Sequence, residues 1–391
     1  METASKPLLD GFTVLDLSSV GPASRCSRIL ADYRATVIKV LPPPSKSSVQ
    51  IQPPFFAYSA NRGLKRVHID LKTADGTATF LRLAAAADVM IESFRPGVVD
   101  RLGLGHEVVR RVNQRIVYCS TSGYGQTGPR AQWAGHDLNY LAVGGLLHCS
   151  GRRSDGGPAL PGATVADSAG GGMHAAIAIL AALLRRSITG HGTYLDVSVA
   201  EGVLLLTSLY IDQHLATGEQ PGPGHDILTG RYACYDVYQA RDGKWLAVGI
   251  IEPAFFANLC KALGLEQWIP HQTDDARQDE IRAAFRAAFA RRDRDDWVAE
   301  LAPRNTCVAP VYSIPELLQD PQFLSRRVWV EAAHAQHGHL RQVGPILAGM
   351  DRSHSKTALP DSAKTDTDEL LRGVGITETQ LAQLRRDGVV A

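Results

Sequence analysis

The chain has 391 residues, which is long for one ordinary domain and ample for two. Lys and Arg total 41 and Asp and Glu total 40, so the net charge of +1 gives no electrostatic reason to expect a nucleic acid or an anionic membrane as a partner. The longest apolar stretch, Ala175 to Leu184, is far shorter than the roughly 20 residues that span a bilayer, and the opening METASKPLLDG lacks the pattern of a signal peptide. We therefore expect a soluble, cytoplasmic protein.

The first part of the chain alternates between strand and helix patterns. Short β-branched and apolar runs predict strands at residues 13–17, 35–40, 68–71, 88–93, 115–123 and 194–199. Helical spacing of apolar residues predicts helices at residues 24–33, 76–86, 106–112 and, after three glycines, 173–186. Such alternation predicts a parallel sheet covered on both faces, with ligands bound outside the carboxyl ends of its strands.

Pro and Gly crowd together at residues 220–224 (QPGPG), which predicts a domain boundary. Beyond it, residues 232–250 read as a hairpin whose turn is Asp242-Gly243. The charged residues 284–301 read as a helix with a solvated face. We predict an α/β fold with a large domain and a smaller α+β domain, at residues 1–220 (rejoined by 326–391) and 225–325 respectively.

The end of the chain predicts one more helix, at residues 377–386. Thr377 and Gln380 have the spacing of a capping box, and Gly388 marks the stop. Elsewhere, the six cysteines form no Cys-x-x-Cys pair and have no His at metal-ligand spacing. We therefore expect reduced thiols, with neither a disulfide framework nor a metal site.

Six segments stand in an order that resembles the family III CoA-transferases. They are LDGFTVLDLSSVGP, ADYRATVIKV, NRGLKRVHIDLK, ADVMIESFRPGVVDRLGLG, STSGYGQTGP and AGHDLNY. The resemblance covers residues 8 to about 350. It implies a large Rossmann-like domain, a smaller domain, an acyl-CoA substrate and an interlocked homodimer. The active site would lie between the large domain of one subunit and the small domain of the other.

Within that family the chain is more similar to the α-methylacyl-CoA racemases. GHDLNY (135–140) matches the segment that carries the racemase His, here His136. VADSAGGG (165–172) matches the segment that carries an Asp shared by racemases and transferases, here Asp167. GIIEP (249–253) matches the segment whose Glu, here Glu252, orients that His. Residues 225–260 lack the glycine run of the formyl-CoA transferases, whereas the residues after Asp167 and Leu64 depart from the family pattern and bear on substrate range.

The chemistry explains why these residue types are needed. Inverting the carbon next to a thioester requires two acid/base groups on opposite faces and a donor for the enolate oxygen. We assign His136 and Asp167 as the two groups, with Glu252 of the partner chain fixing the imidazole tautomer. Asp137 is expected to cap the helix that it begins and to stabilise the proton of Asp167, while its backbone N–H meets the enolate oxygen.

Each of these residues also has an ordinary structural interpretation. His136 and Asp137 stand at the start of a predicted helix, where Asp137 is also a plain N-cap residue. Asp167 precedes another helix, and Glu252 before Pro253 is a common helix start. The structural and catalytic roles of Asp137 are compatible.

CoA needs partners for its phosphates. Five basic residues lie inside the family segments, and we expect two or three of them to contact CoA; they are Arg25, Lys39, Arg62, Arg66 and Arg95. Gly21 would let the backbone approach the pantetheine or pyrophosphate. No metal and no cofactor beyond the CoA moiety of the substrate is expected, because the thioester itself acidifies the proton.

Two other functions are consistent with parts of the pattern. A CoA-transferase would use Asp167 as a nucleophile that forms a mixed anhydride and then a CoA thioester, a route that needs no base at His136. A CoA-binding protein without activity would keep the basic residues but lose the acid/base set. The sequence leaves the acyl group open among branched fatty acyl, sterol side-chain and aryl-propionyl groups.

Overall fold

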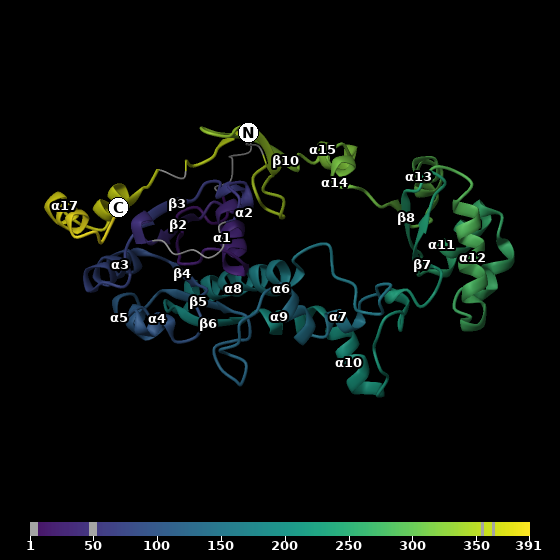
Figure 1. The fold of residues 1–391 in the computed structure, drawn as a ribbon, viewed down its shortest axis with the longest axis horizontal. Coiled ribbons are helices and arrows are strands. Elements are labelled where there is room, and N and C mark those ends of the chain that lie inside the picture. The colour runs from purple at the N-terminus through teal and green to yellow at the C-terminus, as the bar shows by residue number, and fades with distance from the viewer. Residues whose placement is uncertain (1–6, 47–52, 353–355, 362–363) are drawn as a thin grey trace. The chain divides into compact units, whose positions relative to one another are not determined.

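The computed structural model describes residues 7–46, 53–352, 356–361 and 364–391, which form two compact units (Figure 1). Unit 1 comprises Met1–Gly144, Pro161–Leu206 and Pro321–Ala391, and unit 2 comprises Gly145–Leu160 and Thr207–Asp320. The chain passes from unit 1 to unit 2 at Thr207 and returns to unit 1 at Pro321. Both points lie earlier than the boundaries near 220–225 and 325–326 that the sequence predicts. The helix α10 (Ser208–Thr217), which lies before the predicted boundary, therefore belongs to unit 2 and has no buried residue.

Unit 1 is built on a six-stranded parallel sheet, as the sequence predicts. The strand order is β3-β2-β1-β4-β5-β6, the order of a doubly wound Rossmann fold. In chain order the strands are β1 (Thr13–Asp16), β2 (Thr36–Leu41), β3 (Lys65–His68), β4 (Val89–Glu92), β5 (Val117–Ser122) and β6 (Thr193–Ser198). The order reverses between β1 and β4, which defines the switch point of the sheet.

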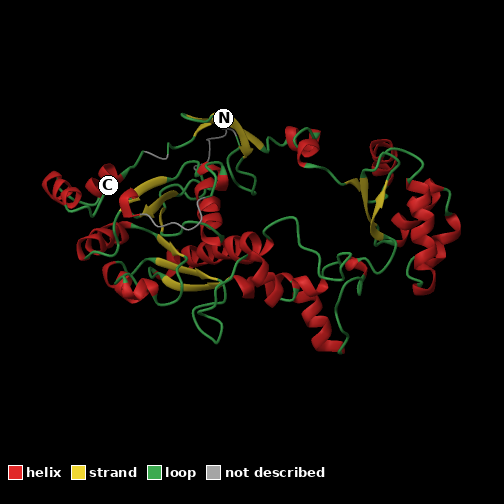
Figure 2. Ribbon diagram, in the orientation of Figure 1, coloured by secondary structure: helices red, strands yellow, loops and turns green. Residues whose placement is uncertain are grey.

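Helices cover both faces of this sheet (Figure 2). Neighbouring residues of one strand point to opposite faces, so Val14 packs in one apolar cluster and Leu15 in the other. The first face carries α1 (Pro22–Asp32) and α8 (His174–Thr189). The other helices before residue 207 in unit 1 are α2 (Ala57–Ala60), α3 (Ala74–Ala86), α4 (Val98–Arg101), α5 (His106–Val112), α6 (Asp137–Val143), η2 (Ala166–Met173) and α9 (Val199–Leu206), with a 3-10 turn η1 (Pro44–Lys46).

The C-terminal segment returns to unit 1 and completes the second face. Its elements are α15 (Pro321–Ser325), β10 (Trp329–His334), β11 (Gly338–Val343), β12 (Lys356–Ala358), α16 (Thr367–Gly373) and α17 (Glu378–Arg386). Leu371 and Leu381 pack beside Phe80 of α3 in the second cluster. Thr377 accepts a hydrogen bond from the Gln380 N–H, so the predicted final helix and its cap are confirmed.

The third strand is one prediction that the structure corrects. The sequence places it at residues 68–71, but β3 ends at His68. The neighbouring β2 ends at Leu41, just before Pro42, and therefore offers no further strand partner. The chain beyond His68 pairs instead with the C-terminus, through the bridge between Ile69 and Val390.

Unit 2 is smaller and has its own apolar core. Its antiparallel sheet, in the order β7-β8-β9, consists of β7 (Tyr235–Gln239), β8 (Trp245–Gly249) and β9 (Val308–Pro310). The predicted hairpin is therefore confirmed, with Gly243 at a φ of 78° in its turn. The helices are α7 (Leu146–Cys149), α10, α11 (Pro253–Leu263), α12 (Gln278–Phe289), α13 (Arg294–Leu301) and α14 (Ile314–Leu317), with 3-10 turns η3 (Ile227–Thr229), η4 (Glu266–His271), η5 (Asp275–Arg277) and η6 (Ala302–Arg304).

The charged stretch 284–301 departs from the prediction of one helix with a solvated face. It breaks between α12 and α13. Arg294 is buried and pairs with Glu316 at 2.8 Å. A buried guanidinium needs such a partner, which a pattern of charges along the sequence does not reveal.

One helical stretch among the described residues, Ala166–Thr189, has the length and hydropathy of a membrane-spanning helix. It has 24 residues and a mean hydropathy of 1.4 over its most apolar window. Ala175, Ile179 and Leu183 on this stretch pack in the core of unit 1, against residues of α1 and β5. Because the core helix of a globular protein passes the same test, the stretch is weak evidence for a membrane span.

Candidate active site

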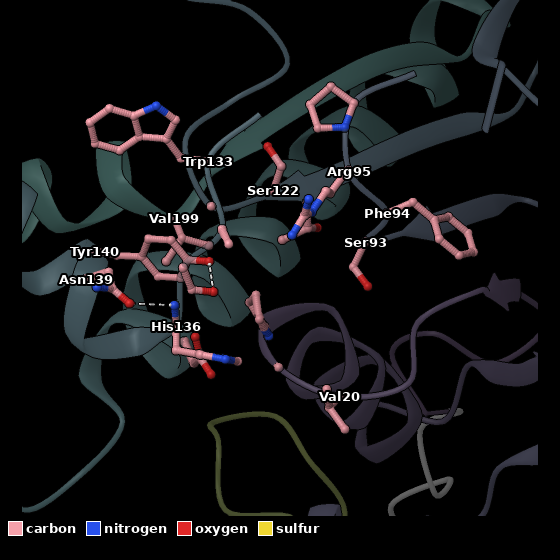
Figure 3. Close-up of a pocket in the computed structure, with 18 of the residues that line it drawn as sticks. Val20, Ser93, Phe94, Arg95, Ser122, Trp133, His136, Asn139, Tyr140 and Val199 are labelled. Atoms are coloured by element: carbon pink, nitrogen blue, oxygen red, sulfur yellow. Dashed lines mark hydrogen bonds between the residues drawn. The ribbon is translucent and has the colours of Figure 1, made fainter. Parts of the chain in front are cut away.

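A cavity of about 580 Å³ opens at the switch point of the sheet in unit 1. The loop after β1 (Ser19–Pro22) and the loop after β4 (Ser93–Pro96) both line it, as expected where the strand order reverses. Thr121 and Ser122 at the end of β5 complete this edge. Figure 3 shows Ser93 and Arg95 on one wall of the cavity and His136 on another.

His136 lies in this cavity at the start of α6. Its extended backbone (φ −128°, ψ 176°) makes it the N-cap, and Asn139 Oδ1 accepts a hydrogen bond from its N–H at 3.0 Å (Figure 3). The imidazole is thereby presented at the edge of the helix, in an exposed residue. Figure 3 also shows Tyr140, whose hydroxyl donates to the Gly135 carbonyl at 2.6 Å.

Asp137 does not cap the helix that it begins, contrary to the prediction from the sequence. It is the first helical residue, because His136 takes the N-cap position. Its Oδ1 instead accepts a hydrogen bond from the backbone N–H of Asp167 at 2.8 Å. Asp137 therefore links α6 to η2, the two elements that carry His136 and Asp167.

Asp167 lines the same cavity, from the first turn of η2. Burial raises the pKa of its carboxyl, and the nearby Asp137 carboxylate raises it further, while Arg25 and His136 act in the opposite direction. The raised pKa brings this carboxyl closer to the range in which a histidine titrates. His136 and Asp167 are thus brought together as the sequence predicts.

The element that carries Asp167 is a π-helix, a rare form that is frequent at functional sites. Its glycines allow close packing, since a Cβ on Gly171 would lie 2.4 Å from Pro22 Cβ. A Cβ on Gly172 would lie 2.8 Å from Arg25 Cβ, and one on Gly202 of α9 would lie 1.9 Å from the Gly170 carbonyl oxygen. The glycine run therefore sets how closely η2 lies to α1 and α9.

Aromatic residues that the sequence analysis did not identify form part of the cavity wall. Trp133 and Tyr140 line the cavity, and Tyr124 packs edge-on against both rings, with centroids 6.0 and 5.2 Å away. Burial raises the pKa of Tyr140 to about 12. Tyr124 and Tyr140 stand in the quoted segments STSGYGQTGP and GHDLNY, so their place in these segments could have indicated them, whereas Trp133 lies between the two segments.

The expected CoA-binding residues separate into two groups. Arg95 and Gly21 line the first cavity. Arg25 hydrogen-bonds Thr164 Oγ1 at 2.6 Å, and its guanidinium carbon lies 5.6 Å from the centre of the Tyr58 ring. Arg95 and Gly21 can therefore contact a ligand in the first cavity. Arg25 does not line this cavity, but it lies close enough to Asp167 to affect the pKa of that carboxyl.

A second cavity of about 530 Å³ in unit 1 lies at the carboxyl ends of β2 and β3 and is lined by Lys39 and Arg66. Burial lowers the pKa of Arg66. Phe55 and His337 stack there with ring centres 3.8 Å apart, and His334 lies beside them. The two histidines come from the C-terminal segment, so local sequence patterns around the basic residues gave no sign of them.

Lys39 and Arg62 are engaged inside the protein. Lys39 is buried and pairs with Asp16 at 3.0 Å, although part of it also lines the second cavity. Arg62 is buried, pairs with Asp32 at 3.0 Å and donates to the Val343 carbonyl. Both cations are therefore occupied by structural partners.

Glu252 belongs to unit 2 and is the N-cap of α11, immediately before Pro253. Its carbonyl accepts hydrogen bonds from Phe255 and Phe256, and its exposed side chain makes no capping bond in the described chain. The helix-start interpretation from the sequence is confirmed. Its proposed role toward His136 stays a prediction.

The fold and the cavity define a doubly wound α/β protein with a histidine and an aspartate in a cavity at the switch point of its sheet. A family model described as CoA-transferase family III matches residues 9–362. The chain is 32% identical to the alpha-methylacyl-CoA racemase of Homo sapiens and 34% identical to that of Mus musculus, and each alignment covers 98% of this chain and 97% of the relative. The protein belongs to CoA-transferase family III.

Other relatives carry out other reactions by name. The acetyl-CoA:oxalate CoA-transferase of Acetobacter aceti is 29% identical, over 92% of this chain and 94% of the relative. Among solved structures, a CAIB/BAIF family protein from Brucella suis matches with a TM-score of 0.75 and 27% identity, covering 94% of this chain and 99% of that one. A hypothetical protein from Mycobacterium tuberculosis matches with a TM-score of 0.77 and 25% identity, covering 93% and 99%. Family membership alone thus leaves the reaction open.

Proposed function

We propose that the protein is a racemase that inverts the α-carbon of 2-methylacyl-CoA thioesters. The observation that carries the proposal is the presence of His136 and Asp167 in one cavity, linked through Asp137. The racemase relatives, at 32% and 34% identity over nearly the whole chain, support the same reaction.

In the proposed reaction, one of the two groups takes the α-proton and leaves an enolate, and the other returns a proton to the opposite face. His136 serves one face and Asp167 the other. The raised pKa of Asp167 favours this reaction. Two groups of similar pKa can each act as the base in one direction of the reaction and as the acid in the other. The backbone N–H of Asp137, in the first turn of α6, is our candidate donor to the enolate oxygen.

CoA would extend across both cavities. Ser19 lines the two of them, so a ligand that passes this residue reaches from one to the other. Arg66 would neutralise phosphate in the second cavity, whose aromatic residues suit an adenine ring, and Arg95 would hold the ligand in the first. Beyond the CoA moiety of its substrate, the proposed reaction needs no cofactor.

We also propose a homodimer, in which the partner's small domain contributes Glu252 to each active site. An exposed apolar row along η2 and α8 supports this proposal, because such a row suits contact with the surface of another subunit. The row consists of Met173, Ile177, Leu184 and Ile188. A transferase that uses Asp167 as a nucleophile is the second candidate, supported by the oxalate-transferase relative.

Proton exchange in deuterated water separates the two reactions. A single enantiomer of a 2-methylacyl-CoA is incubated with the purified protein and followed by NMR. The racemase incorporates deuterium at the α-position and inverts that carbon without any added carboxylate. Strict dependence on a carboxylate acceptor, with no exchange, would assign the protein to the transferases.

A further inference from the structure

A turn of left-handed helix stands beside the second cavity. Tyr58, Ser59, Ala60 and Asn61 have φ values of 50°, 55°, 51° and 54°, and none of them is glycine. A left-handed turn brings the Cβ of an L-residue close to the following carbonyl oxygen, so four in a row are strained. Such strain persists only where the surrounding structure holds it, and it is concentrated at functional sites.

The surrounding structure does hold this turn. Ala60 is buried in a small cluster with Ala332 and Leu359 of the C-terminal segment. The N–H of Arg62 donates to the Ser59 carbonyl at 3.0 Å, and the buried Arg62 side chain is itself fixed by Asp32. The turn is therefore clamped on both sides.

The result of this conformation is the position of the Tyr58 hydroxyl. The Gly21 N–H donates to Tyr58 Oη at 2.7 Å. Gly21 lines the first cavity and Tyr58 lines the second, while Ser19 lines both. The hydroxyl thus lies in the wall where the two cavities adjoin.

The O–H of Tyr58 is available as a hydrogen-bond donor in this wall. A phenol oxygen carries one O–H donor in addition to its acceptor lone pairs. The contact with Gly21 uses a lone pair, and the described chain provides no acceptor for the O–H of Tyr58. The Arg25 guanidinium over the ring, 5.6 Å from its centre, further fixes the direction of the phenol.

We propose that the Tyr58 hydroxyl donates a hydrogen bond to an oxygen of the chain that joins the nucleotide of CoA to its sulfur, in the outer phosphate of the pyrophosphate or in the pantetheine. Gly21 orients the hydroxyl, and the strained turn keeps it in the wall between the cavities. This inference rests on the proposed binding of CoA across both cavities, and it adds a binding residue to that site.

The test compares two ligands on two variants by titration calorimetry. Tyr58→Phe keeps the ring and removes the hydroxyl, and we expect it to weaken CoA binding about 3- to 10-fold, the effect of one hydrogen bond. Adenosine 3′,5′-bisphosphate lacks the pantetheine and the second phosphate of the pyrophosphate, so its affinity should not change. Tyr33→Phe is the matched control, because the Tyr33 hydroxyl donates to the Ala348 carbonyl and lines neither cavity.

Unchanged CoA affinity in Tyr58→Phe overturns the inference, and so does an equal loss for both ligands, which would place the hydroxyl on the nucleotide. Ser59→Gly separates strain from binding: glycine tolerates the left-handed conformation, so its Tm should be no lower than that of the wild type, and its CoA affinity should be unchanged. If Tyr58→Phe is unstable, adding Ser59→Gly should restore Tm but not affinity; restored affinity would contradict the inference.

The inference and the proposed function fail in different ways. A wild-type protein that binds CoA but exchanges no α-proton refutes the racemase, while the Tyr58→Phe affinity still decides the role of the hydroxyl. A wild-type protein that does not bind CoA overturns both.

Discussion

Glu92 is a buried carboxyl at the end of β4, directly before the loop that carries Arg95 into the first cavity. Its Oε2 accepts a hydrogen bond from the Phe94 N–H at 2.8 Å. Burial raises the pKa of Glu92 from 4.5 to about 7, and Asp100 and Asp196 add to the rise against hydrogen bonds from Ser120 and Phe94. A buried carboxyl with a raised pKa therefore stands directly before the loop that lines the first cavity.

We predict that Glu92 lowers stability as the pH rises. Between pH 4.5 and 7 the folded protein holds a proton that the unfolded chain has lost, so the free energy of unfolding falls across this window. Glu92→Gln cannot ionise and can still accept from Phe94. From pH 5 to pH 8 the variant should gain about 2–3 kcal/mol relative to the wild type, measured by urea unfolding at both pH values.

The exposed residue Asp10 provides a control, because Asp10→Asn makes the same change of carboxyl to amide outside the core. This variant should show the same difference from the wild type at pH 5 as at pH 8. If the stability of Glu92→Gln relative to the wild type is also independent of pH, Glu92 has the same pKa in the folded and the unfolded protein. That result would contradict the prediction.

The two acid/base residues are expected to act on opposite faces of the substrate. His136→Ala and Asp167→Ala should each lower kcat by roughly 10²-fold or more, the scale of one lost acid/base group. Each variant should impair deuterium exchange from one enantiomer more than from the other. Turnover close to that of the wild type in either variant would remove that residue from the mechanism.

At this scale, sequence motifs found residues whose chemistry is local and missed those that depend on the fold. His136 and Asp167 stand in recognisable segments and line one cavity. Tyr58 was missed because the position of its hydroxyl depends on a left-handed backbone and on a hydrogen bond from Gly21, 37 positions away. Arg62 was one of five candidates of which two or three were expected to contact CoA, and its buried pairing with Asp32 became visible only in three dimensions.

Among the elements, η2 packs closely on α1 through its glycines. We predict that Gly171→Ala destabilises the protein by about 1–3 kcal/mol, the usual effect of overpacking, because the new Cβ would lie 2.4 Å from Pro22 Cβ. Since η2 carries Asp167, kcat for proton exchange should fall as well. Gly162→Ala is the control, since a Cβ there meets nothing within 4 Å. Equal Tm values for the two variants would show that α1 and η2 can separate without cost.

The elements themselves were largely predictable, for a physical reason. Parallel strands buried on both faces form continuous apolar runs, and β4 and β5 are buried along their whole length. The position of β3 was missed by three residues because the neighbouring β2 ends just before Pro42 and the chain after β3 pairs with Val390. The π-helical form of η2, which packs against α1 and α9, was not predicted from the sequence.

At the scale of the whole molecule, the proposed acid/base residues His136 and Asp167 belong to unit 1, whereas Glu252 belongs to unit 2. If each active site combines the large domain of one subunit with the small domain of its partner, His136→Ala and Glu252→Ala damage complementary halves of a site. In a heterodimer with one change on each chain, one site then holds both lesions and the other holds neither. We predict that such heterodimers regain activity approaching half that of the wild type, while both mutant homodimers remain weak.

The measurement requires co-expression of two differently tagged chains, because interlocked subunits would exchange slowly once folded. Tandem affinity purification isolates the mixed species, and mass spectrometry confirms that it contains both chains. A heterodimer of two His136→Ala chains carrying the two tags controls for the tags and should stay inactive. If both residues came from one chain, every site in the mixed species would carry one lesion, and activity would stay low. A confirmed heterodimer without recovery would therefore place Glu252 in the same subunit as its His136, or outside the site.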